Sequence, residues 1–531
     1  MDRVVVAGIG QQGRELLAKI DGWLEGISAW SAGPVSTAYT PDMAAAHERI
    51  KSGMGQSPDV VLRWVDVPAC APGRVLVAYV DGMVDTQVID QDVLGPLQTT
   101  VSPPSTWDRG TIRAGHVRPR RDWNDILEDL SAGSTVVLAS GCAVAWSVET
   151  AKYKQRGLTR PQTETSVRGP DEAFNEVLAT QITQIRRHFR TPALRFCILT
   201  AGLQKTPVAV AYLKGVTNPA LVESVVERLG RLPLEVWPNA TAIGGMIRDH
   251  PRSIFPTIRN TERVGFAAWQ LAEGKVVILV DGDPFVLIAP APLADFYRTA
   301  MDYGGAWYDA SFVRLIRMAG WALGVYLPAL YIALTQVNNS VLPANLMIVI
   351  EGSRAGLPIT PVSEVLLMVF TLEVLREAAL RLPKALGPTI GTVGAIVVGT
   401  AIVKAGVVSP QIIVLITLTA LAFYTAPVYE LTGTWRVVNF CMLIGAAVLG
   451  LLGITAVTLL VMGELTRLSS FGTPYFEPWA PLRPVDWRDV AVRVPWAILH
   501  RRPTSARPLD VGWPPAPAVG SPPLRRGRRR A

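Results

Sequence analysis

Residues 319–335 read AGWALGVYLPALYIALT, a run without a charged side chain. A helix needs about 20 apolar residues to cross the hydrocarbon core of a bilayer, so this run is close to the required length. Further apolar runs occupy 390–408, 412–429 and 437–462. The sequence therefore predicts an α-helical transmembrane bundle in a domain at 309–472.

The segment 359–380 is also rich in apolar residues, but it carries four candidate intramembrane charges: Glu364, Glu373, Arg376 and Glu377. Charged side chains at membrane depth normally face a bundle interior or water. On a helix, Glu373 can pair with Arg376, and Glu377 with Arg381. A structural role in such pairs and a pore-lining role both remain open.

Small residues recur every fourth position between 387 and 399, so one face of the predicted helix has almost no side chains. Helix backbones approach one another closely at such faces. Three polar residues share the segment and would face an aqueous path if the glycine face meets neighbouring helices. The candidate pore or helix-packing residues are Gly387, Gly391, Thr392, Ala395, Gly399, Thr400 and Lys404.

The last apolar run, 437–462, is long for one span and contains Gly445, Gly450 and Gly453. It is therefore either one tilted helix or a broken pair of helices. A straight helix would place the Pro/Arg-rich tail at 473–531 outside the cell, whereas a broken pair would return it to the cytoplasm. Positive charge collects on the cytoplasmic side of membrane proteins, which favours the broken pair.

The chain has 531 residues, of which 49% are hydrophobic and 18% charged, and its net charge of +8 is concentrated in the tail. Beside a membrane helix such a cluster marks the cytoplasmic side or anionic lipid rather than nucleic acid. The four cysteines and five histidines are scattered without metal-ligand spacing, and no catalytic triad or paired-carboxylate motif is visible. We therefore expect no metal, no cofactor and no enzymatic activity.

The first 308 residues alternate strand-like and helical patterns, which predicts a soluble α/β (α+β) region. Within it, 77-VAYVDG-82 is echoed by 210-VAYLKG-215, and a second pair of passages repeats later in the same order. Two related subdomains are expected, at 45–160 and 161–308, after a lead-in at 1–44. The N-terminus lacks the pattern of a signal peptide, so this region is expected on the cytoplasmic side.

The lead-in contains Gly8-x-Gly10-x-x-Gly13, the outward form of a dinucleotide-binding fingerprint. A Rossmann unit also needs a second apolar strand that ends in an acidic residue about 20 positions later. Residues 30–41 form a polar, proline-containing stretch instead. Nucleotide binding is therefore kept only as an alternative.

Several passages together resemble the A subunit of GerA-type spore germination receptors. The similarity covers about 57–503, and the passages are 166-SVRGP-170, 261-TER-263, 272-AEGKVVILVDG-282, 327-LPALYIALT-335, 375-LREA-378 and 405-AGVVSP-410. This chain departs from the family pattern at Val369, Thr400 and Lys404. If those positions line a conduit, its ion preference is expected to differ from that of typical relatives.

The resemblance implies an integral protein of the spore inner membrane that works with a transporter-like B subunit and a lipoprotein C subunit. It also implies a homo-oligomeric ring whose helices release ions when a nutrient germinant is sensed. Two alternatives stay open. One is a germination-amplifying paralogue without a nutrient-binding partner, and the other is a membrane-anchored scaffold or nucleotide-binding protein.

Overall fold

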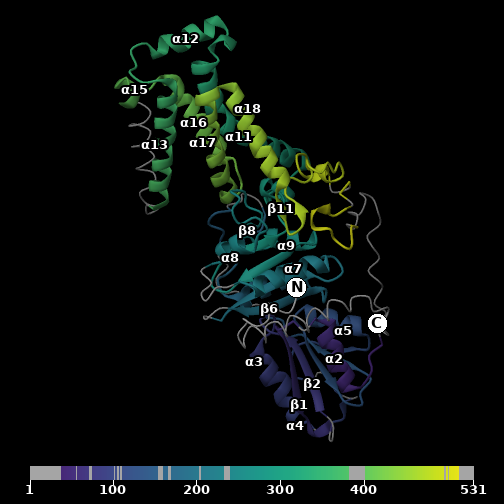
Figure 1. Cartoon of the computed structure of the whole chain (residues 1–531). Coiled ribbons are helices and arrows are strands. Elements are labelled where there is room, and N and C mark those ends of the chain that lie inside the picture. Colours follow the sequence, from purple (N-terminus) through teal and green to yellow (C-terminus); the bar gives the residue numbers. More distant parts are fainter. Residues whose placement is uncertain are drawn as a thin grey trace, which may run out of the picture.

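The computed structural model describes residues 38–55, 57–70, 74–100, 102–104, 107, 111–152, 160–164, 169–201, 205–232, 239–381, 401–495, 498–499 and 501–512. These residues form two α/β subdomains and a helical region, which follow one another along the molecule (Figure 1). The fingerprint-like stretch 8–13 lies outside the described residues.

The first subdomain is built on an antiparallel five-stranded sheet with the order β1-β2-β4-β5-β3. The strands are β1 Val60–Asp66, β2 Arg74–Val80, β3 Val117–Arg120, β4 Thr135–Ala139 and β5 Ala145–Val148. Side chains alternate between the two faces of a strand. Val75 and Val77 of β2 accordingly join one core, and Leu76 and Ala78 join the other.

Helices cover both faces of this sheet. Two helices pack on the face of Leu76, namely α2 Met43–Gly53 and α5 Trp123–Ser131. A short helical chain packs on the opposite face, and its parts are α3 Thr86–Val88, the π-helix Ile89–Leu94 and α4 Gly95–Thr99.

The second subdomain repeats this arrangement with the sheet order β6-β7-β9-β10-β8, which is the same order of strands. Its strands are β6 Leu194–Ala201, β7 Thr206–Leu213, β8 Arg259–Thr261, β9 Val276–Val280 and β10 Val286–Ala289. The echoed passages at 77–82 and 210–215 run from the equivalent strands β2 and β7 into the turn that follows each. The strand order thus agrees with the predicted internal repeat.

Helices again cover both faces. One core contains α6 Leu178–His188 and α9 Val264–Ala272, and the other contains α7 Pro219–Gly230 and α8 Ala240–Ile247. The end of α9 leads into β9 and, beyond β10, into the helical region. Residues at the end of α9 and after β10 therefore lie where they can contact the helical region.

The helical region begins earlier than the apolar run, because α11 extends over Trp307–Ile332 and continues as a π-helical turn to Val337. The other helices are α12 Ala344–Arg354, α13 Pro361–Arg381, α15 Ile402–Lys404, α16 Pro410–Tyr424, α17 Tyr429–Leu449 and α18 Leu451–Arg467. Among the described residues, two helices, 307–337 and 429–449, are long and apolar enough to cross a membrane. The predicted run 412–429 is divided, since α16 ends at Tyr424.

Contacts among the helices are extensive, with α11 packed against α16 and α17, and α17 packed against α18. The break predicted in the last apolar run is confirmed. Gly450 separates α17 from α18 with a φ of +60°, a conformation that favours glycine. Directly after the turn, a Cβ at Gly453 would overlap the carbonyl oxygen of Gly445, so the two helices touch at their backbones.

The chain after α18 returns to the second subdomain. Ser470 Oγ donates a hydrogen bond to the carbonyl of Thr257 (2.5 Å), and Leu509 N donates to the carbonyl of Val216 (2.9 Å). The sequence predicted a tail from residue 473. Up to residue 512 this part, here called the C-terminal segment (469–512), is instead packed on the soluble region, because its serine, arginine and backbone groups bond to that subdomain.

Candidate functional site

The candidate pore residues from Gly387 to Thr400 lie outside the described residues. Lys404 is the one member of that group that the structure describes, and it is exposed at the end of α15. In Figure 1, α15 and α12 lie at the end of the helical region that points away from the two sheets.

Glu364 lies in the first turn of α13, and its side chain is fully buried. Its Oε1 accepts a hydrogen bond from Nε of Arg354 of α12 (3.0 Å) and forms an ion pair with Nη2 of the same arginine (2.9 Å), and its Oε2 accepts the backbone N–H of Ser409 (3.1 Å). Ser409 is the N-cap residue of α16, where unpaired N–H groups and the helix dipole favour a carboxylate. Glu364 therefore ties three helices together in this structure.

Glu373 joins α13 to α17. Its carboxylate accepts from Arg376 Nη1 (2.8 Å) and from Arg436 Nη1 (2.9 Å), so two guanidinium groups share one acid. Glu377 and Arg381 form the other pair that helical spacing suggested, at 2.7 Å and exposed to solvent. The partner Arg436 was not anticipated, because it comes from a different helix.

A second cluster of charges, unforeseen from the sequence, lies where α11 meets the soluble region. Asp302 is 2% exposed and accepts hydrogen bonds from two arginines of α11. Arg314 Nε donates at 2.9 Å, and Arg317 donates through Nη1 at 3.0 Å and Nη2 at 2.8 Å. These bonds hold the start of α11 to Asp302, which precedes the helix in the chain.

The C-terminal segment enters the same cluster through Asp489. Its carboxylate accepts from Arg314 Nη1 (3.0 Å), Arg298 Nη2 (2.8 Å) and the hydroxyl of Tyr303 (2.7 Å). Arg298 also pairs with Glu273, which follows α9 of the second subdomain.

Together these groups form what we call the junction network, with four acids and four bases that are all at least nine-tenths buried as residues: Glu273, Asp295, Asp302, Asp489, Lys275, Arg298, Arg314 and Arg317. The network links the second subdomain, α11 and the C-terminal segment. Buried charges are tolerated when they are paired and hydrogen-bonded, and here the charges are balanced.

The electrostatics of the junction network lower the pKa of two of its acids, Asp302 and Asp295. Burial alone would raise the pKa of Asp302, but the hydrogen bonds and charges of its two arginine partners outweigh burial and hold the pKa below its usual value. The same balance, with Lys275 as the main cation, lowers the pKa of Asp295. Burial raises the pKa of Tyr303. These directions suit a mechanical connection better than proton transfer at neutral pH.

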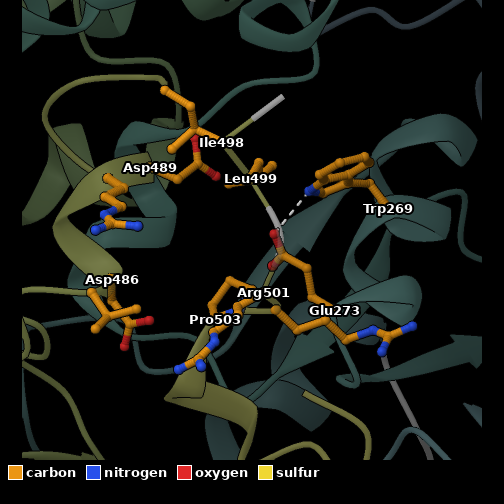
Figure 2. Close-up of a pocket in the computed structure, with 11 residues that line it drawn as sticks. Trp269, Glu273, Asp486, Asp489, Ile498, Leu499, Arg501 and Pro503 are labelled. Atoms are coloured by element: carbon orange, nitrogen blue, oxygen red, sulfur yellow. Dashed lines mark hydrogen bonds between the residues drawn. The ribbon is translucent and has the colours of Figure 1, made fainter. Parts of the chain in front are cut away.

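A cavity of about 360 Å³ borders the junction network, between α9 and the C-terminal segment (Figure 2). Its wall includes Glu273, Asp486 and Asp489. Trp269 Nε1 donates to Glu273 Oε1 at 2.8 Å, the dashed line in Figure 2, and Asp486 accepts from the hydroxyl of Thr504. Each of these carboxylates already has partners.

In the part of the chain that the structure describes, no group of three or more His, Cys, Asp or Glu side chains is placed to hold a metal ion. The arrangement found at the junction is instead one of ion pairs that fasten separate parts of the chain together.

The sequence held only a faint signal of the junction network. Arg314 and Arg317 lie just before the apolar run at 319–335, whereas Asp302 and Asp489 are far apart in sequence from each other. Their meeting depends on the return of the chain after α18, which local patterns do not reveal.

Comparison with known proteins identifies relatives along most of the chain. The family model described as Bacillus/Clostridium GerA spore germination protein matches residues 48–505. Spore germination protein B1 of Bacillus subtilis is 34% identical over 468 residues, which cover 87% of this chain and 97% of that protein. Spore germination protein KA of the same organism is 32% identical over 477 residues, 89% of this chain and 88% of that protein.

A solved structure is also similar, that of the N-terminal domain of the A subunit of the Bacillus megaterium spore germinant receptor GerK3. It is 28% identical, with a TM-score of 0.39 over 49% of this chain and 98% of that chain. From the family match and the extent of the curated relatives, we conclude that this chain belongs to the GerA family of spore germination receptor A subunits.

Proposed function

We propose that the chain is the A subunit of a nutrient germinant receptor in the spore inner membrane, and that copies of it assemble into a ring that releases ions when nutrient is sensed. Its partners would be a transporter-like B subunit and a lipoprotein C subunit. The observation that carries the proposal is the family match over 48–505, which includes both the sheets and the helices.

The helical region would be a transmembrane bundle. Two of its helices have the length and hydropathy of spans, and α17 and α18 expose large apolar side chains. Val448, Leu452, Leu459 and Leu460 are each at least 70% exposed. Exposed apolar surface of this extent is expected to face lipid or a neighbouring subunit rather than water.

The soluble region would transmit the nutrient signal to the helices. Because the junction network fixes the start of α11 to the second subdomain and to the C-terminal segment, a displacement of that subdomain would pull on the helix. Packed elements joined by buried ion pairs move as units rather than deform gradually. The soluble region and the C-terminal segment would share the cytoplasmic side, since they pack together.

The segment that lines the proposed ion conduit would be the one that contains Gly387, Gly391, Thr392, Ala395, Gly399, Thr400 and Lys404. Small residues would let helices of neighbouring copies crowd together, and the threonine hydroxyls would offer polar groups to passing ions. Glu364 and Glu373, with their arginine partners, would hold the surrounding helices in place.

Electron microscopy of the purified full chain in detergent tests the assembly. We expect a ring with a central hole bordered by the segment 387–404 and with the two sheets on one side. A monomer, or a closed assembly in which that segment lies on the outer surface, would contradict the proposal.

A further inference from the structure

A second cavity, of about 340 Å³, lies between the second subdomain and the loop that joins α16 to α17. Three arginines and one glutamate contribute the charged part of its wall, and we call it the arginine cavity: Arg259, Arg263, Arg317 and Glu164. The three arginines are each at least 92% buried. Its charged side chains therefore carry an excess of positive charge.

The arginines of this cavity are incompletely neutralised. Arg317 is paired with Asp302, whereas among the described residues the side-chain hydrogen bonds of Arg259 and Arg263 go to neutral backbone carbonyls. Arg263 donates to the carbonyls of Glu164 and Pro170, both at 2.6 Å. A buried cation that has no carboxylate in hydrogen-bonding contact is only partly compensated, and a bound anion would recover part of the free energy lost on burial.

Arg259 is an arginine whose charge is only partly compensated. Its Nη1 donates to two carbonyls, including that of Arg298 at 2.9 Å, while its Nη2 lies 3.7 Å from Glu164 Oε1, beyond hydrogen-bond distance. The guanidinium is stacked 3.9 Å from the ring centre of Phe266, which fixes its plane. Burial lowers the pKa of Arg259 despite the nearby carboxylates, the direction expected for a charge that lacks full compensation.

The cavity lies at the level where the polar part of the molecule gives way to the apolar helices. Arg317 comes two residues before the apolar run that begins at Ala319. Tyr424, on the wall, is the last residue of α16 and is 67% exposed. A Cβ at Gly320 would overlap Thr425, so this loop touches α11 at the start of its apolar part. Tyrosines and basic pockets at this level are typical of contact with lipid headgroups.

We propose that the arginine cavity binds a phosphate group. Guanidinium groups match the oxygens of phosphate in both charge and geometry, and three of them line this one cavity. The phosphate comes from the headgroup of an anionic phospholipid or from free phosphate in solution. The site does not depend on ion conduction, so a protein that binds phosphate but conducts nothing would overturn only the proposed function.

The test adds a competing negative charge to the cavity without removing an arginine. Ala426 lines the cavity, and Ala426→Glu would bring a carboxylate there, while Ala426→Gln has almost the same shape without the charge. Native mass spectrometry of the full chain in detergent, titrated with phosphatidylglycerol, phosphatidylcholine or inorganic phosphate, measures binding. We expect Ala426→Glu to bind the phosphate-bearing anion at least about tenfold more weakly than Ala426→Gln, from the repulsion between close like charges.

Selective binding of phosphatidylglycerol that inorganic phosphate does not displace would support a lipid headgroup as the occupant. Binding of inorganic phosphate that displaces the lipid would support free phosphate. Binding that is absent in the wild type, or equal in the two Ala426 variants, would overturn the inference. Met301→Glu with Met301→Gln as its control repeats the comparison from another segment of the wall, in case the Ala426 loop does not tolerate substitution.

Discussion

Replacing Asp302 with asparagine should loosen the start of α11 from the soluble region. The aspartate receives hydrogen bonds from Arg314, from Arg317 and from the N–H and hydroxyl of Thr299, all between 2.8 and 3.1 Å. Asparagine has nearly the same shape but no charge, so two buried guanidinium groups would lose their shared counter-ion.

The expected magnitude follows from the burial of the group. Removing one partner of a buried ion pair costs about 3–5 kcal/mol, because the remaining charge stays uncompensated. For a unit of 150–250 residues, each kcal/mol lowers the melting temperature by about 2–4 °C. The Asp302→Asn protein should therefore melt roughly 6–20 °C below the wild type.

Melting in detergent followed by tryptophan fluorescence measures the difference. Asp309→Asn is the matched control, because Asp309 is exposed in the first turn of the same helix. The pKa of Asp302 is lowered from 3.8, so its contribution is present above that pH and is lost as the pH falls through the lowered value. The gap between wild type and variant should thus persist at neutral pH and shrink in acid. A shift no larger than that of the control would refute the reasoning.

Two further substitutions test the helical region by the same melting assay. Gly453→Ala should destabilise the hairpin of α17 and α18, because the added methyl group would overlap the carbonyl oxygen of Gly445. Gly463→Ala is the control and should leave stability unchanged, because there is open space around Gly463. Glu364→Gln should cost more than about 1 kcal/mol, because it breaks a buried pair with Arg354, while Glu377→Gln, which breaks an exposed pair, should cost less than that. Equal effects within either pair of variants would count against the packing described.

The sequence predicted those features of the fold that rest on local patterns. The echo of 77–82 in 210–215 indicated two related subdomains because equivalent strands bury the same alternating residues. A broken pair within 437–462 was favoured over one tilted helix because of the positively charged tail, and the structure places the break at Gly450, one of the three glycines of the run. The i,i+4 pair of Glu377 and Arg381 followed from helical periodicity alone.

The features that the sequence did not reveal depend on contacts between distant segments. The junction network needs Asp489 to return to Arg314, and the chain between them passes through the whole helical region. The same return packs the C-terminal segment on the second subdomain, although its prolines and arginines suggested a free tail. The apolar run alone begins at Ala319, after the start of α11 at Trp307, because the first turns carry Arg314 and Arg317, whose charges are compensated by ion pairs with distant acids.

The most direct measurement of the central claim is potassium release from spores after the addition of nutrient. Spores that lack this chain, or that carry Gly391→Leu in the candidate pore segment, should release potassium more slowly than spores in which the wild-type chain is restored. Normal release from both kinds of spore, with the variant protein present at wild-type amount, would contradict the assignment of this chain to ion release.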